Sequence, residues 1–384
     1  MLMNAKLMPL TTAVAFALAT ATGMACAQEQ VVKIGHVGPL TGPVAHMGKD
    51  NENGARMAIE ELNARGITLA GQKVQFVLQS EDDGSDPKLA TTVAQKLVDA
   101  KVQGVVGHLQ SGTSIPASKI YYDAGIPQIS PSATSRKYTQ QGFNTTFRVV
   151  ANDGQLGSTL GRYAAKTLHA KTVAVIDDRT AYGQGLADEF IKSAKAAGIN
   201  IVSTQYTSDR ATDFNAILTT IKGKKPDLIF FGGIDASAGP MLHQMKLLGM
   251  KVKLMGGDAI CTNQLPQLAG DGLLDDQVVC AEAGGVEKSG QKKLDAFKAA
   301  YKKRYNSEIR QYAPYTYDAV MTIADAMQKA NSADPKIYLP QLAKIHHKGV
   351  TGDIAFDANG DIKDGVLTIY TFRNGQRTVL TVTK

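Results

Sequence analysis

The stretch GVVGHLQSGTSIPASKIYYDAGIPQISPSAT, from Gly104 to Thr134, decides the fold of this chain. It is patterned as a short strand rich in β-branched residues, a hydroxyl-rich turn, a helix and a second short strand. Another hydroxyl-rich turn follows the second strand. Because the carboxyl ends of neighbouring parallel strands meet at one edge of an open α/β sheet, both turns are expected at that edge, where ligands bind.

Two clusters of small hydrogen-bond donors occupy these turns: Ser111 to Ser114, and Ser132 to Thr134 with Ala133 between them. Backbone N–H groups at a helix start, together with Ser and Thr hydroxyls, suit a carboxylate or a phosphate, because free donors and the helix dipole both favour negative charge. The alternative for one cluster alone is that Ser111 or Thr113 merely caps the helix. Two clusters at one sheet edge favour a ligand site.

The rest of the chain repeats this β-then-α order in two runs, which predicts an α/β fold with mainly parallel sheets covered by helices on both faces. Met47 is expected in the turn before the first helix. In the first run we expect strands at 31–37 and 73–79 and helices at about 51–64 and 87–100. In the second run we expect helices at about 154–168, 182–197 and 213–222, and strands at 172–177, 199–205, 227–233 and 253–257.

The C-terminal part is patterned differently, with three consecutive helices at about 288–304, 312–329 and 335–346. Two segments after them, 352–361 and 365–375, are expected to pair as strands. Their Asn359-Gly360 and Asn374-Gly375 dipeptides are turn signals. No low-complexity linker separates the two runs, which favours a hinge made of several strands.

Residues 1–27 are typical of a secretory signal peptide. Lys6 is the only charge before Glu29, an apolar run covers 13–19, and Ala25-Cys26-Ala27 is a small-residue cleavage site. Gly23 stands where a lipid-attachment signal usually has a larger aliphatic residue, so plain cleavage is favoured over a lipoprotein anchored through Cys26. No later stretch approaches the roughly 20 apolar residues of a membrane span. We therefore expect an exported protein that does not span the membrane.

Charge and cysteine content agree with export. Cleavage lowers the formal net charge from +7 to +6, and no basic tract is interleaved with aromatic residues, which argues against nucleic-acid binding. After cleavage only Cys261 and Cys280 remain, and in an oxidising compartment an isolated pair usually forms one disulfide. Neither cysteine has a Cys or His at metal-ligand spacing, so no metal site is expected.

Catalytic signatures are scarce in this sequence. It contains no G-x-S-x-G elbow, no Walker loop and no H-E-x-x-H, and its seven His residues are scattered. Asp258 is more informative, since it follows a short apolar strand and two glycines. It either caps a turn or faces the hydroxyl clusters across a cleft. In the second arrangement one wall offers donors for an anion and the other a carboxylate for a cation, which complements an α-amino acid.

The strings GHLQSGTSIPASKIYYDAGIPQISPSAT, TGPVAHMG and DDRTAYGQGLA resemble the periplasmic leucine/isoleucine/valine-binding family, the type I periplasmic binding proteins of ABC transporters. The resemblance extends over essentially the whole mature chain. It implies two α/β lobes, a three-strand hinge and an amino acid bound between the lobes. The implied limits are 1–27 for the signal peptide, 28–152 plus 282–364 for the first lobe, and 153–281 plus 365–384 for the second.

The resemblance also implies roles for individual residues. Ser111 would contact the ligand carboxylate, Thr134 both the carboxylate and the ammonium, and Ser132 the ligand through its backbone, with Ala133 beside it. Asp258 would hold the ammonium. The remaining contacts would come from residues along the ligand side chain, which are Met47, Tyr182, Ile234 and Tyr312.

Departures from the family pattern concern the side-chain pocket. Family members usually have aromatic residues in place of Met47 and Ile234, and Glu in place of Asp258. A shorter acid requires further closure or a bridging water. Family members often have a disulfide at the positions of Ser85 and Gln110, and in this chain both cysteines are absent together. We therefore expect the contacts to the ligand's carboxylate and ammonium groups to be kept, whereas the pocket for its side chain should have a different shape.

The sequence therefore predicts an exported monomeric protein without catalytic activity or cofactor, which binds an apolar α-amino acid (Leu, Ile or Val) for an inner-membrane ABC permease. One alternative is a binding protein for an aromatic or short-chain carboxylate, although a buried Asp258 without a cation would then be costly. Another is a sensory protein that delivers its ligand to a receptor.

Overall fold

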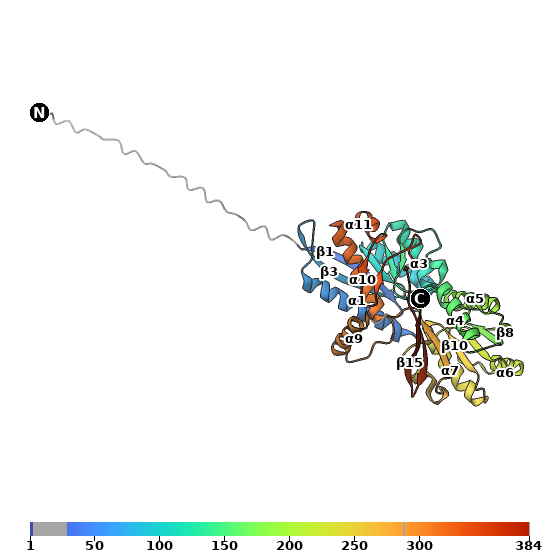
Figure 1. Cartoon of the computed structure of the whole chain (residues 1–384). Coiled ribbons are helices and arrows are strands. Elements are labelled where there is room, and N and C mark those ends of the chain that lie inside the picture. Colours follow the sequence, from blue (N-terminus) through green and yellow to red (C-terminus); the bar gives the residue numbers. More distant parts are fainter. Residues whose placement is uncertain (3–28, 287–288, 384) are drawn as a thin grey trace.

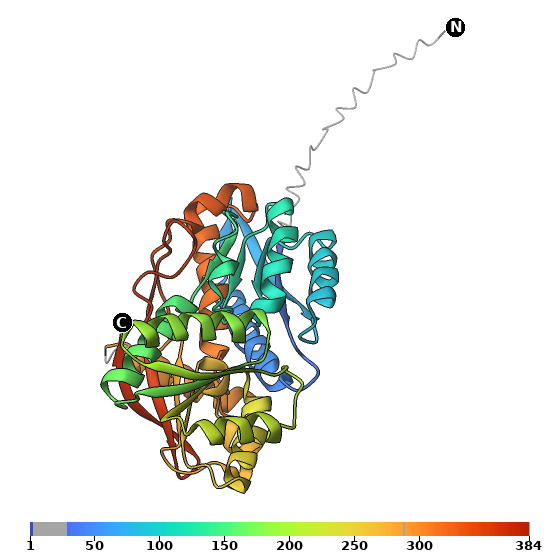
Figure 2. The ribbon, with the colours of Figure 1, turned by 90° about the vertical axis from the view of Figure 1, so that its right-hand side faces the viewer.

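The computed structural model of the chain describes residues 1–2, 29–286 and 289–383, and it forms two lobes (Figures 1 and 2). The predicted signal peptide, with Cys26, lies outside the described residues except for its first two positions. Each lobe contains one mainly parallel sheet between helices, so the predicted two-lobed α/β fold is confirmed.

Lobe 1 is built on a six-stranded sheet in the order β2-β3-β1-β4-β5-β6, in which only β2 is antiparallel to its neighbour. Its face with Ile34 and Val106 packs against α1 and α10, and its opposite face, with Val37 and Val105, packs against α2 and α3. The strands are β1 (Gln30–Gly38), β2 (Thr68–Leu69), β3 (Gln72–Asp82), β4 (Gly104–Gly107), β5 (Gln128–Ser130) and β6 (Thr146–Arg148). The helices are α1 (Ala45–Arg65), α2 (Pro87–Asp99), α3 (Ser111–Ala124), α9 (Gln291–Tyr305), α10 (Ala313–Ala330) and α11 (Pro335–Leu342).

Lobe 2 is built on a seven-stranded sheet in the order β15-β14-β11-β10-β9-β7-β8, parallel except for β14 and β15. Its face with Val175 and Phe230 packs against α4 and α5, and its other face packs against α6, α7 and α8. The strands are β7 (Thr172–Asp177), β8 (Asn200–Tyr206), β9 (Leu228–Gly232), β10 (Lys253–Gly256), β11 (Val278–Glu282), β14 (Leu367–Arg373) and β15 (Gln376–Thr383). The helices are α4 (Asp153–Lys166), α5 (Ala181–Ala196), α6 (Asn215–Lys224), α7 (Asp235–Leu247) and α8 (Leu265–Ala269).

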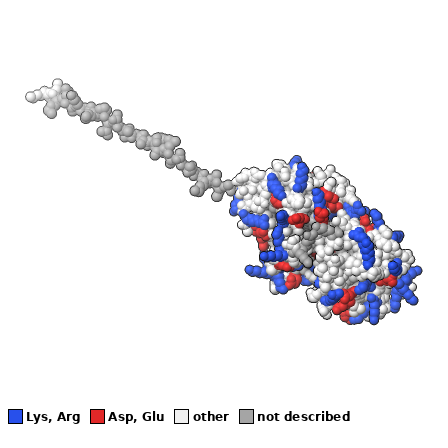
Figure 3. All heavy atoms as spheres, in the orientation of Figure 1, with Lys and Arg blue, Asp and Glu red and all other residues white. Residues whose placement is uncertain are grey.

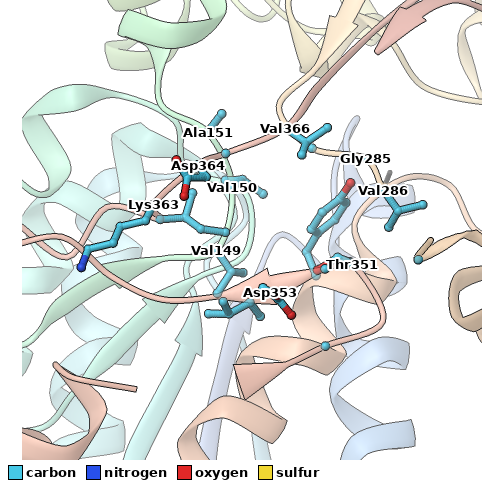
Figure 4. A pocket seen from close by; sticks show the side chains of 18 of the residues that line it. Val149, Val150, Ala151, Gly285, Val286, Thr351, Asp353, Lys363, Asp364 and Val366 are labelled. Carbon is cyan, nitrogen blue, oxygen red and sulfur yellow. The ribbon is translucent and has the colours of Figure 1, made fainter. Parts of the chain in front are cut away.

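The chain passes between the two sheets three times: after β6, after β11 and before β14. The first two crossings are joined by a hydrogen bond from the Ala151 N–H to the Ala283 carbonyl (3.0 Å). A cavity of about 390 Å³ lies beside all three crossings (Figure 4), between Val149, Gly285 and Val366. None of the predicted ligand-binding residues lines this hinge cavity.

The predicted pairing of 352–361 with 365–375 is wrong. Strand β14 pairs with β11 and β15, and in the first segment only β13 (Asp353–Ile354) forms a ladder, with β12 (His347–Lys348). The first segment folds as a loop because the Asp357 carboxylate accepts the N–H groups of Asn359 and Asp361. The Asn374-Gly375 signal is a hairpin turn, with φ of 50° and 68°, and it leads into a strand that the sequence did not reveal, β15.

The first helix begins earlier than predicted, at Ala45 in place of about Asn51, so Met47 lies in its first turn and not in the preceding loop. No side chain caps this helix start, so the signal that usually marks a helix beginning is missing. Gly48 permits the early start, because a Cβ there would lie 2.0 Å from the Pro39 carbonyl oxygen. The earlier start turns the side chain of Met47 into the core of the molecule.

Cys261 and Cys280 form a disulfide, which ties the segment after β10 to β11 (S–S 2.07 Å). On the face seen in Figure 3, Lys and Arg are interspersed with Asp and Glu. Among the described residues, no helix combines the length and the apolar character that a membrane crossing requires. That part of the chain also contains no cluster of His, Cys, Asp or Glu that could hold a metal ion.

Candidate functional site

A cavity of about 320 Å³ lies between the lobes, at the carboxyl ends of strands from both sheets. It lies where ligands bind in open α/β sheets, and its volume is in the range typical of small-molecule sites. Seven of the predicted ligand-binding residues line it, and they are Met47, Ser111, Ser132, Tyr182, Ile234, Asp258 and Tyr312. Ala133 and Thr134 are buried behind its wall.

The lobe 1 wall is the start of α3. Ser111 is the first residue of this helix, and its hydroxyl accepts the N–H of Ser135 (3.1 Å), so it does not act as the N-cap. The next residue, Gly112, also lines the cavity and has no other atoms near the position of a Cβ. The N–H groups of Thr113 and Ser114 already donate to the Gln110 carbonyl, which leaves those of Ser111 and Gly112 at the helix start. Together with the Ser111 hydroxyl they form a wall chemically suited to an anion, here called the anion-binding wall, and the helix dipole favours negative charge there.

The second hydroxyl cluster is held by internal hydrogen bonds. The Ser132 hydroxyl donates to the Leu109 carbonyl (2.8 Å), and the Thr134 carbonyl accepts the N–H of Asp153. Fully buried Arg148 donates to the carbonyls of Ala133 and Ser135. The cluster is therefore a rigid turn whose hydroxyl at Ser132 is already engaged.

Asp258 lies on the opposite wall and is the charged centre of the site. It is buried, and its two carboxylate oxygens accept the hydroxyls of Tyr182 and Tyr312, each at 2.8 Å. Tyr182 comes from the first turn of α5 and Tyr312 from the N-cap of α10, so the carboxylate is held from both lobes. Burial raises the pKa of Asp258 to about 6, although both hydroxyls favour its charged form.

No cation neutralises Asp258 within the described residues, since its side-chain partners there are two neutral hydroxyls. A buried carboxylate without a cation is costly, so the geometry favours a cationic ligand group beside it. The anion-binding wall at Ser111 lies across the same cavity. One cavity thus offers complementary groups for both ends of a zwitterion.

A second buried acid, Asp153, lies next to this site at the start of α4. Burial raises its pKa to about 8, the nearby Thr134 hydroxyl favours the charged form, and the negative charge of Asp258 adds to the rise. Both carboxylate oxygens of Asp153 lack a hydrogen-bond partner among the described residues. The sequence analysis did not single out this residue. Its sequence signal was Asn152-Asp153 at a helix start, which is equally typical of ordinary capping.

Asp50 supports the site from behind the cavity, and sequence reasoning missed it. Its buried carboxylate accepts the backbone N–H groups of four consecutive residues, 310 to 313, and the hydroxyl of Tyr301. It thereby fixes the start of α10 and the position of Tyr312. An acid on the buried stripe of α1, three residues after Met47, was the available signal.

The side chain of a bound ligand would meet an apolar wall. It is supplied by four buried residues that line the cavity, which are Met47, Ile234, Val44 and Leu109. Ile234 is the N-cap residue of α7, which brings it to the cavity from lobe 2, whereas Met47 comes from lobe 1. Met47 and Ile234 therefore line the cavity from different lobes.

The chain is similar to known proteins in both sequence and structure. A model of the family described as periplasmic binding protein matches residues 31–376. The chain is 34% identical to the leucine-, isoleucine-, valine-, threonine- and alanine-binding protein of Pseudomonas aeruginosa, over 88% of this chain and 89% of that protein. It is also 34% identical to Leu/Ile/Val-binding protein homolog 1 of Brucella abortus, over 95% and 96% of the two chains.

A similar solved structure is that of the branched-chain amino acid transporter substrate-binding protein LivJ of Streptococcus pneumoniae, in complex with isoleucine. It has a TM-score of 0.82 and 29% identity, and the match covers 92% of this chain and 99% of that one. A leucine-binding protein of Thermotoga maritima has a TM-score of 0.81 and 26% identity, over 91% and 98% of the chains.

Proposed function

The chain belongs to the periplasmic binding protein family, and from that premise we propose that it binds a branched-chain α-amino acid (Leu, Ile or Val) for an ABC importer. The apolar wall at Met47 and Ile234 supports an aliphatic side chain, as does the similarity to proteins named for leucine, isoleucine and valine binding. We further propose that the protein catalyses no reaction.

The observation that carries this proposal is Asp258, a buried carboxylate that lacks a cation and lies across the cavity from the N-terminus of α3. An α-ammonium group would pair with it, and the α-carboxylate would accept the free N–H groups and hydroxyl at Ser111. A carboxylate ligand without an amine would leave Asp258 unpaired, which disfavours aromatic or short-chain acids.

In the proposed mechanism the ligand first docks on lobe 1, where the turn held by Arg148 and the start of α3 are preformed. Lobe 2 then closes and brings Asp258 and Tyr182 to the ammonium group. Contacts made only in the closed arrangement shift the equilibrium toward it. In this proposal the permease recognises the closed form, and the protein acts as a periplasmic monomer after removal of residues 1–27.

A thermal-shift panel of amino acids against simple carboxylic acids tests the ligand class. A specific ligand at a hundred times its dissociation constant stabilises the folded protein by about 2.7 kcal/mol. Leu, Ile or Val should raise the melting temperature, and simple acids should not. In calorimetry, Asp258→Ala should weaken amino-acid binding at least about tenfold, the loss of one charge-assisted contact. Unchanged affinity would refute the zwitterion argument.

A further inference from the structure

One hydrogen bond between the lobes joins residues that are next to cavity residues in the chain: His46 precedes Met47, and Asp235 follows Ile234. His46, in the first turn of α1, donates from Nε2 to Oδ2 of Asp235, the first residue of α7, at 2.9 Å. Their chain neighbours Met47 and Ile234 form the apolar wall of the cavity, while His46 and Asp235 themselves do not line it. The bond therefore joins the lobes directly behind the ligand pocket.

Asp235 depends on this bond more than a surface acid would. The residue is completely buried, its Oδ2 also accepts the Thr262 hydroxyl, and its Oδ1 has no hydrogen-bond partner within the described chain. His46 is 18% exposed, so solvent screens the pair weakly. A hydrogen bond to a buried carboxylate is stronger than one between neutral groups, and it exists only while the lobes are together.

A second ion pair between the lobes provides the contrast. Arg136 and Glu189 meet at 3.0 Å, but their side chains are 43% and 23% exposed. Exposed pairs of this kind contribute little, because solvent screens them. Of these two contacts, the buried one is expected to favour the closed arrangement more strongly.

We propose that His46 and Asp235 form a closure latch, which holds Met47 of lobe 1 against Ile234 of lobe 2 and so sets how long the ligand stays bound. Both are positioning residues, because neither contacts the ligand. The latch rests on the proposed function, since it retains an amino acid in that cavity.

The test is the dissociation rate of Leu, Ile or Val from the mature protein, measured from its tyrosine fluorescence in a stopped-flow instrument. His46→Ala should raise the dissociation rate at least about tenfold, because it removes a hydrogen bond to a charged group, and should change the association rate less than about twofold. His46→Gln should restore most of the lifetime, because its amide N–H can reach the position of Nε2. Arg136→Ala is the matched control and should change the rate less than about twofold.

Small-angle X-ray scattering with saturating ligand gives a second readout, in which His46→Ala should show a larger radius of gyration than the wild type and His46→Gln should not. Equal dissociation rates and radii in wild type and His46→Ala would overturn the latch alone. So would an effect of Arg136→Ala as large as that of His46→Ala. A wild-type protein that binds none of these amino acids would overturn the proposed function, and the latch with it.

Discussion

Replacing Asp258 with Asn should stabilise the unliganded protein at neutral pH while it removes most of the affinity for an amino acid. Burial raises the pKa of Asp258 from 3.8 to about 6. At about 1.4 kcal/mol per pKa unit, the ionised carboxylate costs the folded state about 3 kcal/mol at pH 7. The amide removes that cost, because it carries no charge.

Part of this stabilisation is lost because the Asn side chain cannot keep both hydrogen bonds that Asp258 makes with tyrosine hydroxyls. An Asn side chain has one acceptor oxygen, so only one of Tyr182 and Tyr312 can keep donating to it, and the other must accept from the amide. The Tyr182 hydroxyl already accepts the Ala259 N–H. We assign about 1 kcal/mol to this rearrangement, which leaves a net stabilisation of about 2 kcal/mol.

The effect depends on pH with a definite sign. The unfolded chain releases the Asp258 proton near pH 3.8, whereas the folded protein keeps it up to about pH 6. The protonated carboxyl therefore contributes stability that is fully present below about pH 4 and is lost as the pH rises through about 6. Asp258→Asn should accordingly stabilise the protein at pH 8 and have much less effect at pH 4.5.

Urea denaturation of the unliganded protein at both pH values measures this difference, and calorimetry measures the affinity. Asp178→Asn is the matched control: burial also raises the pKa of Asp178 to about 6, and its Oδ1 alone accepts from Thr180. The control should be stabilised at pH 8 without loss of affinity, since Asp178 does not line the cavity. An Asp258→Asn protein that is destabilised at pH 8, or equally stabilised at both pH values, would refute the reasoning.

Three further predictions concern the surroundings of the site. Asp50→Ala should lower the free energy of unfolding by about 3 to 5 kcal/mol in urea denaturation, because four backbone N–H groups at the start of α10 lose their acceptor. The control on the same helix is Glu60→Ala, which removes an exposed ion pair with Arg304 and should cost less than about 1 kcal/mol. Replacing Cys261 and Cys280 with Ser should cost about 3 kcal/mol, and an unchanged melting temperature under reducing conditions would contradict this. Ile234→Ala should enlarge the cavity and shift the binding preference toward larger ligand side chains such as Phe. Competition calorimetry measures the ratio of Phe to Val affinity, and an unchanged ratio would show that Ile234 does not contact the ligand side chain.

Local patterns were sufficient for much of the fold and for one half of the site. The order of strands and helices follows from alternation and capping signals, and Ser111 was placed correctly because a helix start after a buried strand determines its own geometry. The start of α1 was misplaced because no side chain caps it, so Met47 was assigned to a loop. The predicted strand pairing after residue 350 was wrong because local sequence does not show which strands lie beside β14. Its neighbours in the sheet are β11 and β15.

The other half of the site depends on contacts that local sequence cannot reveal. Asp258 was recognised as an acid after a strand, but its two tyrosine partners are 76 and 54 residues away along the chain. Asp50 reaches the start of α10 across about 260 residues, and His46 reaches Asp235 across 189. Helical periodicity shows that Asp50 faces the core, yet it does not show which backbone groups meet it there. The donors at the start of α3 can thus be predicted from one short segment, whereas the surroundings of Asp258 and the shape of the apolar wall depend on how the two lobes meet.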